Sequence, residues 1–249
     1  MSLQGQVAVI TGSGSGIGRG IALRLAAEGA SIVVNDVTRE AADQTVAQIT
    51  SAGGTAIPGV ADVTAWPSAR ELVETAVARW GRIDILVNNV GAVRDNRIVN
   101  MPVEDWDFIL NLNLTSYFLV TKAAVPQMIS REYGRIVNIS SRAWLGQVGQ
   151  TNYSASKAGI VGMSRSLALE LGRDGITVNT VAPGLIDTPL VRALPEKVQQ
   201  RLLGMQPTGK VGTSADVANA VAFFVHPDAH YITGQVLHVC GGKSVKCDW

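Results

Sequence analysis

A tyrosine and a lysine four residues apart stand near the start of a predicted helix, from about Asn152 to Leu171. This spacing puts the Tyr153 phenol and the Lys157 ammonium on one helix face. A neighbouring cation favours the phenolate and lowers the ordinary phenol pKa of about 10. A tyrosine in this setting can serve as a general base near neutral pH. Taken alone, however, such a pair is too common to identify an active site.

A glycine-rich turn, TGSGSGIG at residues 11–18, joins the first predicted strand to a predicted helix. Glycines let the backbone approach a pyrophosphate closely, and the free N–H groups at the helix start face the anion. The position between a strand and a helix makes this a strong indication of a dinucleotide site. The residues expected to hold the pyrophosphate are Gly12, Ser15, Gly16, Ile17 and Gly18.

Asp36 ends the second predicted strand, 18 residues after Gly18. Its carboxylate can accept hydrogen bonds from both adenosine ribose hydroxyls and would repel a 2′-phosphate. The glycine turn contains no arginine, and Asn35 is neutral. These features predict NAD as the cofactor, while the nearby Arg39 leaves NADP open as the alternative.

Two further strand ends are expected to border the same crevice, because the carboxyl ends of parallel strands meet at one edge of the sheet. Asp62 and Val63 follow the third predicted strand and suit the adenine edge. Asn89 and Gly91 follow the fourth.

Short β-branched runs alternate with longer segments whose apolar residues recur every three or four positions, which is typical of repeated βα units. Because the strands are apolar throughout, helices should cover both sheet faces. We predict an α/β fold in which residues 1–249 form a single Rossmann-type domain with a doubly wound, parallel, seven-stranded sheet. The predicted strands are residues 7–11, 31–36, 55–60, 83–88, 136–140, 177–181 and 236–239.

The composition excludes several classes of protein. Of the 249 residues, 47% are hydrophobic and 16% charged, and 21 basic side chains nearly balance 20 acidic ones. A disordered chain and a nucleic-acid binder that works by neutralising phosphates are excluded. The low charge favours an oligomer.

No uninterrupted apolar run approaches the ~18 residues that cross a bilayer, and the N-terminus does not resemble a signal peptide. We expect a cytoplasmic protein with no membrane partner. Cys240 and Cys247 do not indicate a disulfide framework. His226 and His230 lack a third ligand at a helical interval, so no metal site is predicted.

Several motifs in order resemble the short-chain dehydrogenase/reductase family over essentially the whole chain. Within the family, the chain is similar to 3-oxoacyl-carrier-protein reductases and related secondary alcohol dehydrogenases, for example in Arg94-Asp95-Asn96. The motifs are Thr-Gly-x3-Gly-Ile-Gly, Asn-Asn-x-Gly, Asn113 in Asn-Leu-Asn-Leu, Ser140-Ser141, Tyr153-x3-Lys157 and Pro183-Gly184-x3-Thr188.

The resemblance implies a role for each matching residue. Tyr153 would exchange the proton, Lys157 would bind the nicotinamide ribose, and a serine would hold the substrate oxygen. Asn113 would help to order a water that links Lys157 to solvent. The contacts implied for the nicotinamide are Pro183, Gly184, Ile186 and Thr188.

Two adjacent residues compete for the role of the serine. Ser140 has the family's usual separation of thirteen residues from Tyr153. Aligning the strand end instead selects Ser141 and puts a one-residue deletion in the following loop. We favour Ser141, because loops tolerate deletions and buried strands do not.

Residues near this serine predict a mainly apolar substrate cavity. A proline-rich segment at about 185–210 is expected to act as a substrate lid. Arg94 and Arg142 either meet an acidic substrate tail or are solvated. The predicted lining is Ser141, Val93, Trp144, Leu145, Gln150, Leu190 and Leu194.

The sequence thus predicts an oxidoreductase that transfers a hydride between NAD(H) and a secondary alcohol or ketone, with an apolar, alicyclic or hydroxyacyl small molecule as substrate. The alternatives are an NADPH-dependent 3-oxoacyl thioester reductase and a non-catalytic dinucleotide sensor. The substrate's identity and the direction of reaction stay open. The resemblance also implies a homotetramer, with interface residues Leu112, Tyr117, Leu119, Val161 and Leu169.

Overall fold

The computed structural model describes residues 2–192 and 195–245. Its centre is a seven-stranded sheet in the order β3-β2-β1-β4-β5-β6-β7, in which every neighbouring pair is parallel. The order reverses between β1 and β4, which is the topological switch point of a doubly wound sheet. The predicted fold is confirmed. The strands are β1 (Val7–Ile10), β2 (Ser31–Asp36), β3 (Thr55–Val60), β4 (Ile85–Asn88), β5 (Gly134–Ile139), β6 (Ile176–Pro183) and β7 (Val236–Val239).

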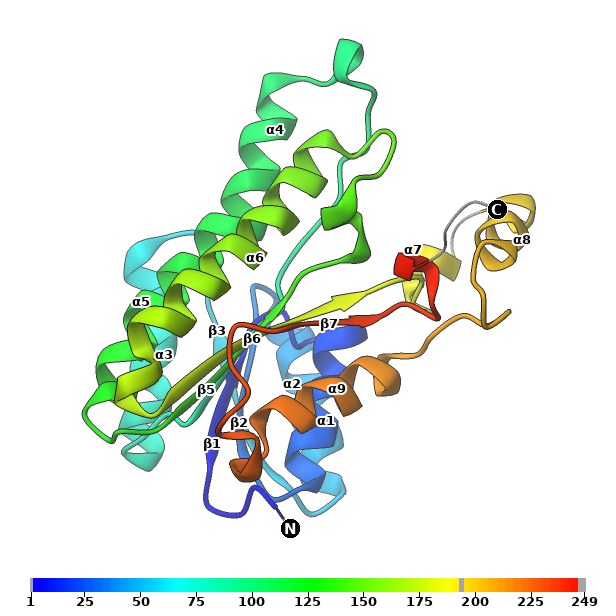
Figure 1. Cartoon of the computed structure of the whole chain (residues 1–249). Helices are drawn as coiled ribbons and strands as arrows, with labels where there is room; N and C mark the ends of the chain where they lie inside the picture. The colour runs from blue at the N-terminus through cyan, green and yellow to red at the C-terminus, as the bar shows by residue number, and fades with distance from the viewer. Residues whose placement is uncertain (1, 193–194, 246–249) are drawn as a thin grey trace.

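Helices cover both faces of the sheet (Figure 1). One face is packed by α1 (Gly16–Ala27), α2 (Arg39–Ser51) and α9 (Ser214–Val225). The other is packed by α3 (Trp66–Trp80), α5 (Ser116–Ile129) and α6 (Thr151–Leu171). Three shorter helices, α4 (Val103–Leu110), α7 (Pro189–Arg192) and α8 (Glu196–Gly204), lie toward the carboxyl ends of the strands (Figure 1).

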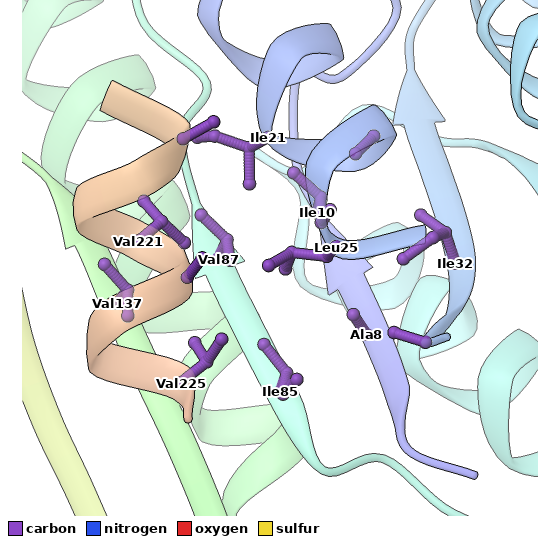
Figure 2. Close-up of a cluster of buried hydrophobic side chains, with 14 of the residues drawn as sticks. Ala8, Ile10, Ile21, Leu25, Ile32, Ile85, Val87, Val137, Val221 and Val225 are labelled. Atoms are coloured by element: carbon purple, nitrogen blue, oxygen red, sulfur yellow. The ribbon is translucent and has the colours of Figure 1, made fainter. Parts of the chain in front are cut away.

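The core on the α1 side joins α1 and α9, which are far apart in sequence, to strands of the sheet (Figure 2). Ile21 and Leu25 of α1 and Val221 of α9 are completely buried against the sheet, where they meet residues such as Ile10 and Val87. The buried side chains of each helix recur at helical spacing, so one face of each helix is removed from water. This burial fixes the start of α1 relative to the end of β1.

The edge strands depart from the predicted burial on both faces. Residues of the central strands β1, β4, β5 and β6 are buried throughout, whereas β3 and β7 are largely half-buried or exposed. Pro58 lies within β3, which an edge strand tolerates because one side of its ladder has no partner. The apolar runs therefore indicated strands correctly but overstated how much of each edge is covered.

By length and composition alone, the continuous helical stretch Val103–Ile129, of 27 residues, could cross a membrane, because an 18-residue window within it has a mean hydropathy of 1.3. One such helix is weak evidence, since the core helix of a water-soluble protein passes the same test. Part of the stretch packs against α3 and α6. The stretch contains no long uninterrupted apolar run, because Glu104, Asp105 and Lys122 lie within it.

Two residues predicted for an oligomer interface lie inside the subunit instead. Tyr117 is completely buried and donates its hydroxyl to Ile139 O at 3.1 Å, and Val161 is also buried. The apolar side chains that α5 and α6 present to solvent include Phe118 and Leu169. The prediction assigned Tyr117 and Val161 to the wrong side of their helices, because both helices have apolar residues on more than one face.

We expect Val221→Ala to lower the free energy of unfolding by about 1.5–3 kcal/mol, since it removes two methyl groups from a fully buried site. Val99→Ala, at a position 82% exposed, is the matched control and should change it by less than about 0.5 kcal/mol. Denaturant unfolding at one fixed protein concentration measures both. Equal effects would contradict the packing described.

Candidate active site

A cavity of about 580 Å³ lies at the carboxyl ends of the central strands. Most of the predicted site residues, from the glycine turn to the segment after β6, line it. They are Gly12, Ser15, Gly16, Ile17, Gly18, Asp36, Asn89, Gly91, Val93, Ser141, Tyr153, Lys157, Pro183, Gly184, Ile186 and Thr188.

The glycine turn is shaped to receive a pyrophosphate. Gly16 has a φ of +54°, and a Cβ built there would meet no atom within 4 Å. At Gly18, in contrast, a Cβ would overlap the turn's own backbone. Ser15 precedes α1 without capping it with its side chain, so the first N–H groups of the helix can still bind an anion. The residues therefore fit a dinucleotide.

Asp36, the last residue of β2, lines the same cavity. Its Oδ1 accepts a hydrogen bond from Thr38 N at 3.0 Å, and its carboxylate packs so closely on Gly14 that no Cβ would fit between them. The nearby Arg39 pairs with Asp43 along α2, with 3.7 Å between charged atoms. Arg19 donates to Gly14 O. The Asp36 carboxylate thus borders the cavity, and Arg39 is paired with Asp43 and not with Asp36.

Two predicted cofactor residues do not line the cavity. Val63 is buried in the core between the sheet and α3. Asp62 Oδ1 accepts hydrogen bonds from Thr64 N and Oγ1, at 2.9 and 2.7 Å. In the structure, both residues therefore act in folding the turn that follows β3.

The two candidate serines have different partners. Ser140 is buried and donates its hydroxyl to Lys157 O at 2.8 Å, which ties β5 to α6. Ser141 forms a side-chain hydrogen bond with Tyr153. Its Oγ also accepts from Ala143 N at 3.1 Å, so the hydroxyl proton is left for an oxygen in the cavity. This geometry supports Ser141 as the substrate-facing serine.

The Tyr153 phenol has a raised pKa, opposite to the sequence prediction. Burial is the largest cause, the hydrogen bond from Ser141 opposes it, and the negative charge of Asp95 adds to it. Burial disfavours the phenolate, because a charge is less stable away from water. The prediction considered only neighbouring positive charges, such as that of Lys157, and missed the loss of solvent.

Lys157 is also affected by burial. Its Nζ donates to Ile139 O at 3.0 Å and lies 5.3 Å from the ring centre of Tyr117 and 5.6 Å from that of Tyr153. Burial lowers the pKa of this ammonium to about 7. In the protein alone, the loss of solvation thus disfavours the charged form of both groups.

Asn113 lies in a π-helical turn, Asn111–Thr115, between α4 and α5. Such turns are frequent at functional sites. Its side chain is completely buried, accepts from Ala92 N at 2.9 Å, and donates to Ala92 O at 3.0 Å and Ser156 Oγ at 3.3 Å. The amide therefore joins the segment after β4 to α6, one residue from Lys157.

The predicted substrate residues fall into three sets by their position in the structure. Val93 and Ser141 line the cavity. Trp144 stacks on His238, Leu145 is 48% exposed, and Gln150 donates to both oxygens of Asp95 at 3.1 and 3.0 Å. Of the other two, Leu190 belongs to α7 and Leu194 lies outside the described residues.

Sequence reasoning missed several residues around the site. Leu185 and Val191 line the cavity, and Asp95 acts on the Tyr153 pKa. Asn152 accepts from Tyr153 N at 2.7 Å and donates to Arg94 O at 3.1 Å, so it connects the start of α6 to the loop after β4. The Arg94-Asp95-Asn96 motif was a usable signal for Asp95, whereas the contacts of Asn152 required the fold.

Known proteins similar to this chain identify its family. A family profile described as "Enoyl-(Acyl carrier protein) reductase" matches residues 12–244. The BbsD subunit of (2S)-[(R)-hydroxy(phenyl)methyl]succinyl-CoA dehydrogenase from Thauera aromatica is 50% identical, covering 98% of this chain and 99% of its own. The chain belongs to the short-chain dehydrogenase/reductase family.

Two more relatives represent related activities. The 3-oxoacyl-[acyl-carrier-protein] reductase FabG of Thermotoga maritima is 44% identical, covering 97% of this chain and 99% of its own. The (3R)-3-hydroxyacyl-CoA dehydrogenase of Mus musculus is 42% identical over 97% of both chains. The protein is an oxidoreductase that interconverts a secondary alcohol and a ketone with a nicotinamide dinucleotide.

A test of the two serines follows from their partners. Ser141→Ala should reduce kcat by about 100-fold, because it removes a donor to the reacting oxygen. Ser140→Ala should instead lower the free energy of unfolding by about 1 kcal/mol through its lost bond to Lys157 O, and retain most activity. Steady-state kinetics and denaturant unfolding of both variants provide the measurement. Full activity in Ser141→Ala would contradict the assignment.

Proposed function

We propose that the protein is an NAD-dependent dehydrogenase of 3-hydroxyacyl thioesters. The observation that carries the cofactor choice is the Asp36 carboxylate at the adenosine end of the cavity. The thioester substrate class is supported by two relatives whose names specify a hydroxyacyl-CoA or a hydroxylated succinyl-CoA. The acyl chain and the direction of reaction are left open.

The choice of NAD rests on charge. A carboxylate at the end of β2 accepts hydrogen bonds from ribose hydroxyls and repels a 2′-phosphate. The arginine that could have attracted that phosphate, Arg39, is paired with Asp43. Arg19 is held by Gly14 O and by Thr45 Oγ1, the latter at 2.9 Å. Both nearby guanidinium groups thus already have partners.

In the proposed mechanism, a bound nicotinamide would accept or donate the hydride, and its oxidised form would bring a positive charge into the cavity that Tyr153 lines. Ser141 holds the substrate oxygen, and Tyr153 takes up or returns the hydroxyl proton. Lys157 binds the nicotinamide ribose and stabilises the phenolate. Asn113 fixes the segment after β4 and helps to order a water that links Lys157 to solvent.

The other predictions are part of the same proposal. Residues 185–210 form a substrate lid over the cavity, where α7 and α8 lie. The active form is a homotetramer, in which the exposed apolar side chains of α5 and α6, such as Phe118 and Leu169, meet another subunit. The enzyme works in the cytoplasm, where the thiol of Cys240, free in the structure, stays reduced.

A second candidate function is the reduction of 3-oxoacyl groups on a carrier protein with NADPH. The 44% identity to a FabG reductase favours it. Asp36 opposes it, because a 2′-phosphate would face a carboxylate. The cofactor preference therefore separates the two candidates.

For the cofactor, wild-type protein should bind NAD at least about tenfold more tightly than NADP, as measured by fluorescence titration. Asp36→Ala should weaken NAD binding by about 10- to 100-fold through the loss of charge-assisted hydrogen bonds. It should also reduce the ratio of NAD affinity to NADP affinity. Glu74→Ala is the control, since this acid pairs with Arg70 on α3, outside the cavity. Tighter binding of NADP by the wild type would refute the assignment.

For the substrate, 3-hydroxyacyl-CoA thioesters should be oxidised with kcat/KM at least about 100-fold above simple aliphatic, alicyclic and aromatic secondary alcohols, because remote binding energy aids catalysis. Absorbance of the reduced cofactor follows the reaction. Tyr153→Phe should lower kcat by at least about 1,000-fold while NAD binding persists, because proton transfer is lost.

Each remaining result has a distinct meaning. Faster oxidation of simple alcohols would overturn the thioester assignment and leave the alcohol dehydrogenase class intact. NAD binding without turnover of any substrate would favour a dinucleotide sensor. Retained activity in Tyr153→Phe would contradict the mechanism.

A further inference from the structure

His238 on the edge strand β7 contacts the segment that carries Ser141. Trp144, in the 3-10 turn η3 (Arg142–Leu145), donates its indole Nε1 proton to His238 Nε2 at 3.0 Å. The rings stack with their centres 5.9 Å apart and their planes 21° apart. An indole N–H can only donate. His238 Nε2 must therefore be unprotonated, with the proton of the neutral ring on Nδ1.

Trp144 and Ser141 share one tight turn. Trp144 N donates to Ser141 O at 3.0 Å, and Ala143 N donates to Ser141 Oγ at 3.1 Å. The Ser141 side chain in turn contacts the Tyr153 phenol. A continuous series of contacts thus leads from His238 through Trp144 to the pair of hydroxyl groups in the cavity.

The backbone of His238 is held in the sheet. It pairs with Ala182 in the parallel ladder between β6 and β7. Ala182 immediately precedes Pro183, which lines the active-site cavity. The turn η3 also packs against α6. Removing the contact with His238 should therefore shift the turn's orientation without unfolding it.

We propose that His238 is a positioning residue for the active site: through Trp144 it fixes the turn 141–145, and it does so only while its imidazole is neutral. This inference rests on the proposed function, because it assigns a purpose to the Ser141–Tyr153 pair. His238 itself is not among the residues that line the active-site cavity.

The surroundings of His238 favour the neutral form. Burial is the main cause of its lowered pKa, and the positive charge of Arg142 on η3 is the second. On another side, His238 borders a cavity of about 390 Å³ with Lys210 and Asp216 among its lining residues. Since the folded-state pKa lies below the ordinary value, the contact is intact at neutral pH. It is lost only as the pH falls through this lowered pKa, which lies below the ordinary histidine value of about 6.5.

The first test compares variants that keep or remove the acceptor. His238→Phe keeps a flat ring but cannot accept the indole proton. It should lower kcat/KM for a 3-hydroxyacyl-CoA by about 3- to 10-fold, as expected for one lost hydrogen bond. His238→Gln offers an amide oxygen and should recover at least half of this loss. NAD affinity should change less than about twofold, because the glycine turn is untouched.

A double-mutant cycle separates the hydrogen bond from general damage. Trp144→Phe removes the donor from the other side and should reproduce the effect of His238→Phe. The double variant should be no worse than either single variant, because both remove the same interaction. Additive losses would overturn the proposal, as would unchanged kcat/KM in His238→Phe.

The acid limb provides a second readout. Proton uptake by Tyr153 makes kcat/KM fall toward low pH in every variant. The wild type should show an additional, reversible drop of about 3- to 10-fold at a pH below about 6.5, which is absent from His238→Phe. His230→Gln is the matched control, since His230 is exposed and elsewhere on the surface, and it should keep the acid limb. An unchanged acid limb in His238→Phe would overturn the pH dependence.

A third measurement does not need turnover. Indole fluorescence of the wild type should titrate with a midpoint below about 6.5, and the transition should disappear in both Trp144→Phe and His238→Phe. If this transition is present but no substrate is turned over, the proposed function has failed and the contact remains. If turnover is normal and the transition is absent from the wild type, the positioning role is wrong and the function stands.

Discussion

Burial of the Lys157 ammonium beneath the carboxyl edge of the sheet is the constraint on which the site depends. A lysine is rarely buried completely, and this one is only 3% exposed. Its Nζ bonds to Ile139 O at the end of β5, while its own carbonyl accepts the Ser140 hydroxyl. These two contacts fix the start of α6 relative to β5, and with it the position of Tyr153.

The same burial prepares the proton chemistry. Burial of the Lys157 ammonium lowers its pKa to about 7, and burial of the Tyr153 phenol raises its pKa. The ammonium and the phenolate are therefore both disfavoured in the protein alone. A positive charge brought beside the phenol would shift this balance toward the phenolate. The site is therefore electrostatically poised to respond to the oxidised cofactor that we propose it binds.

Buried polar contacts below the site hold the surrounding strands in register. Asn88 of β4 donates to Asn138 of β5 at 2.8 Å and to Thr121 at 3.0 Å, and Asn138 donates to Ser164 of α6 at 2.9 Å. Because unpaired polar groups are unfavourable away from water, these bonds specify one arrangement of β4, β5 and α6. That arrangement brings the segment after β4 next to Tyr153.

The sequence by itself determined the order of strands and helices, the glycine turn, Asp36, and the Tyr153–Lys157 pair. These features depend on local spacing, which the chain carries directly. Only the tertiary structure decided which serine faces Tyr153, that Val63 and Tyr117 are core residues, and that His238 contacts Trp144. It also decided the direction of the Tyr153 pKa shift. Burial and contacts between distant segments set these properties, and neither can be read from the spacing of residues along one strand or helix.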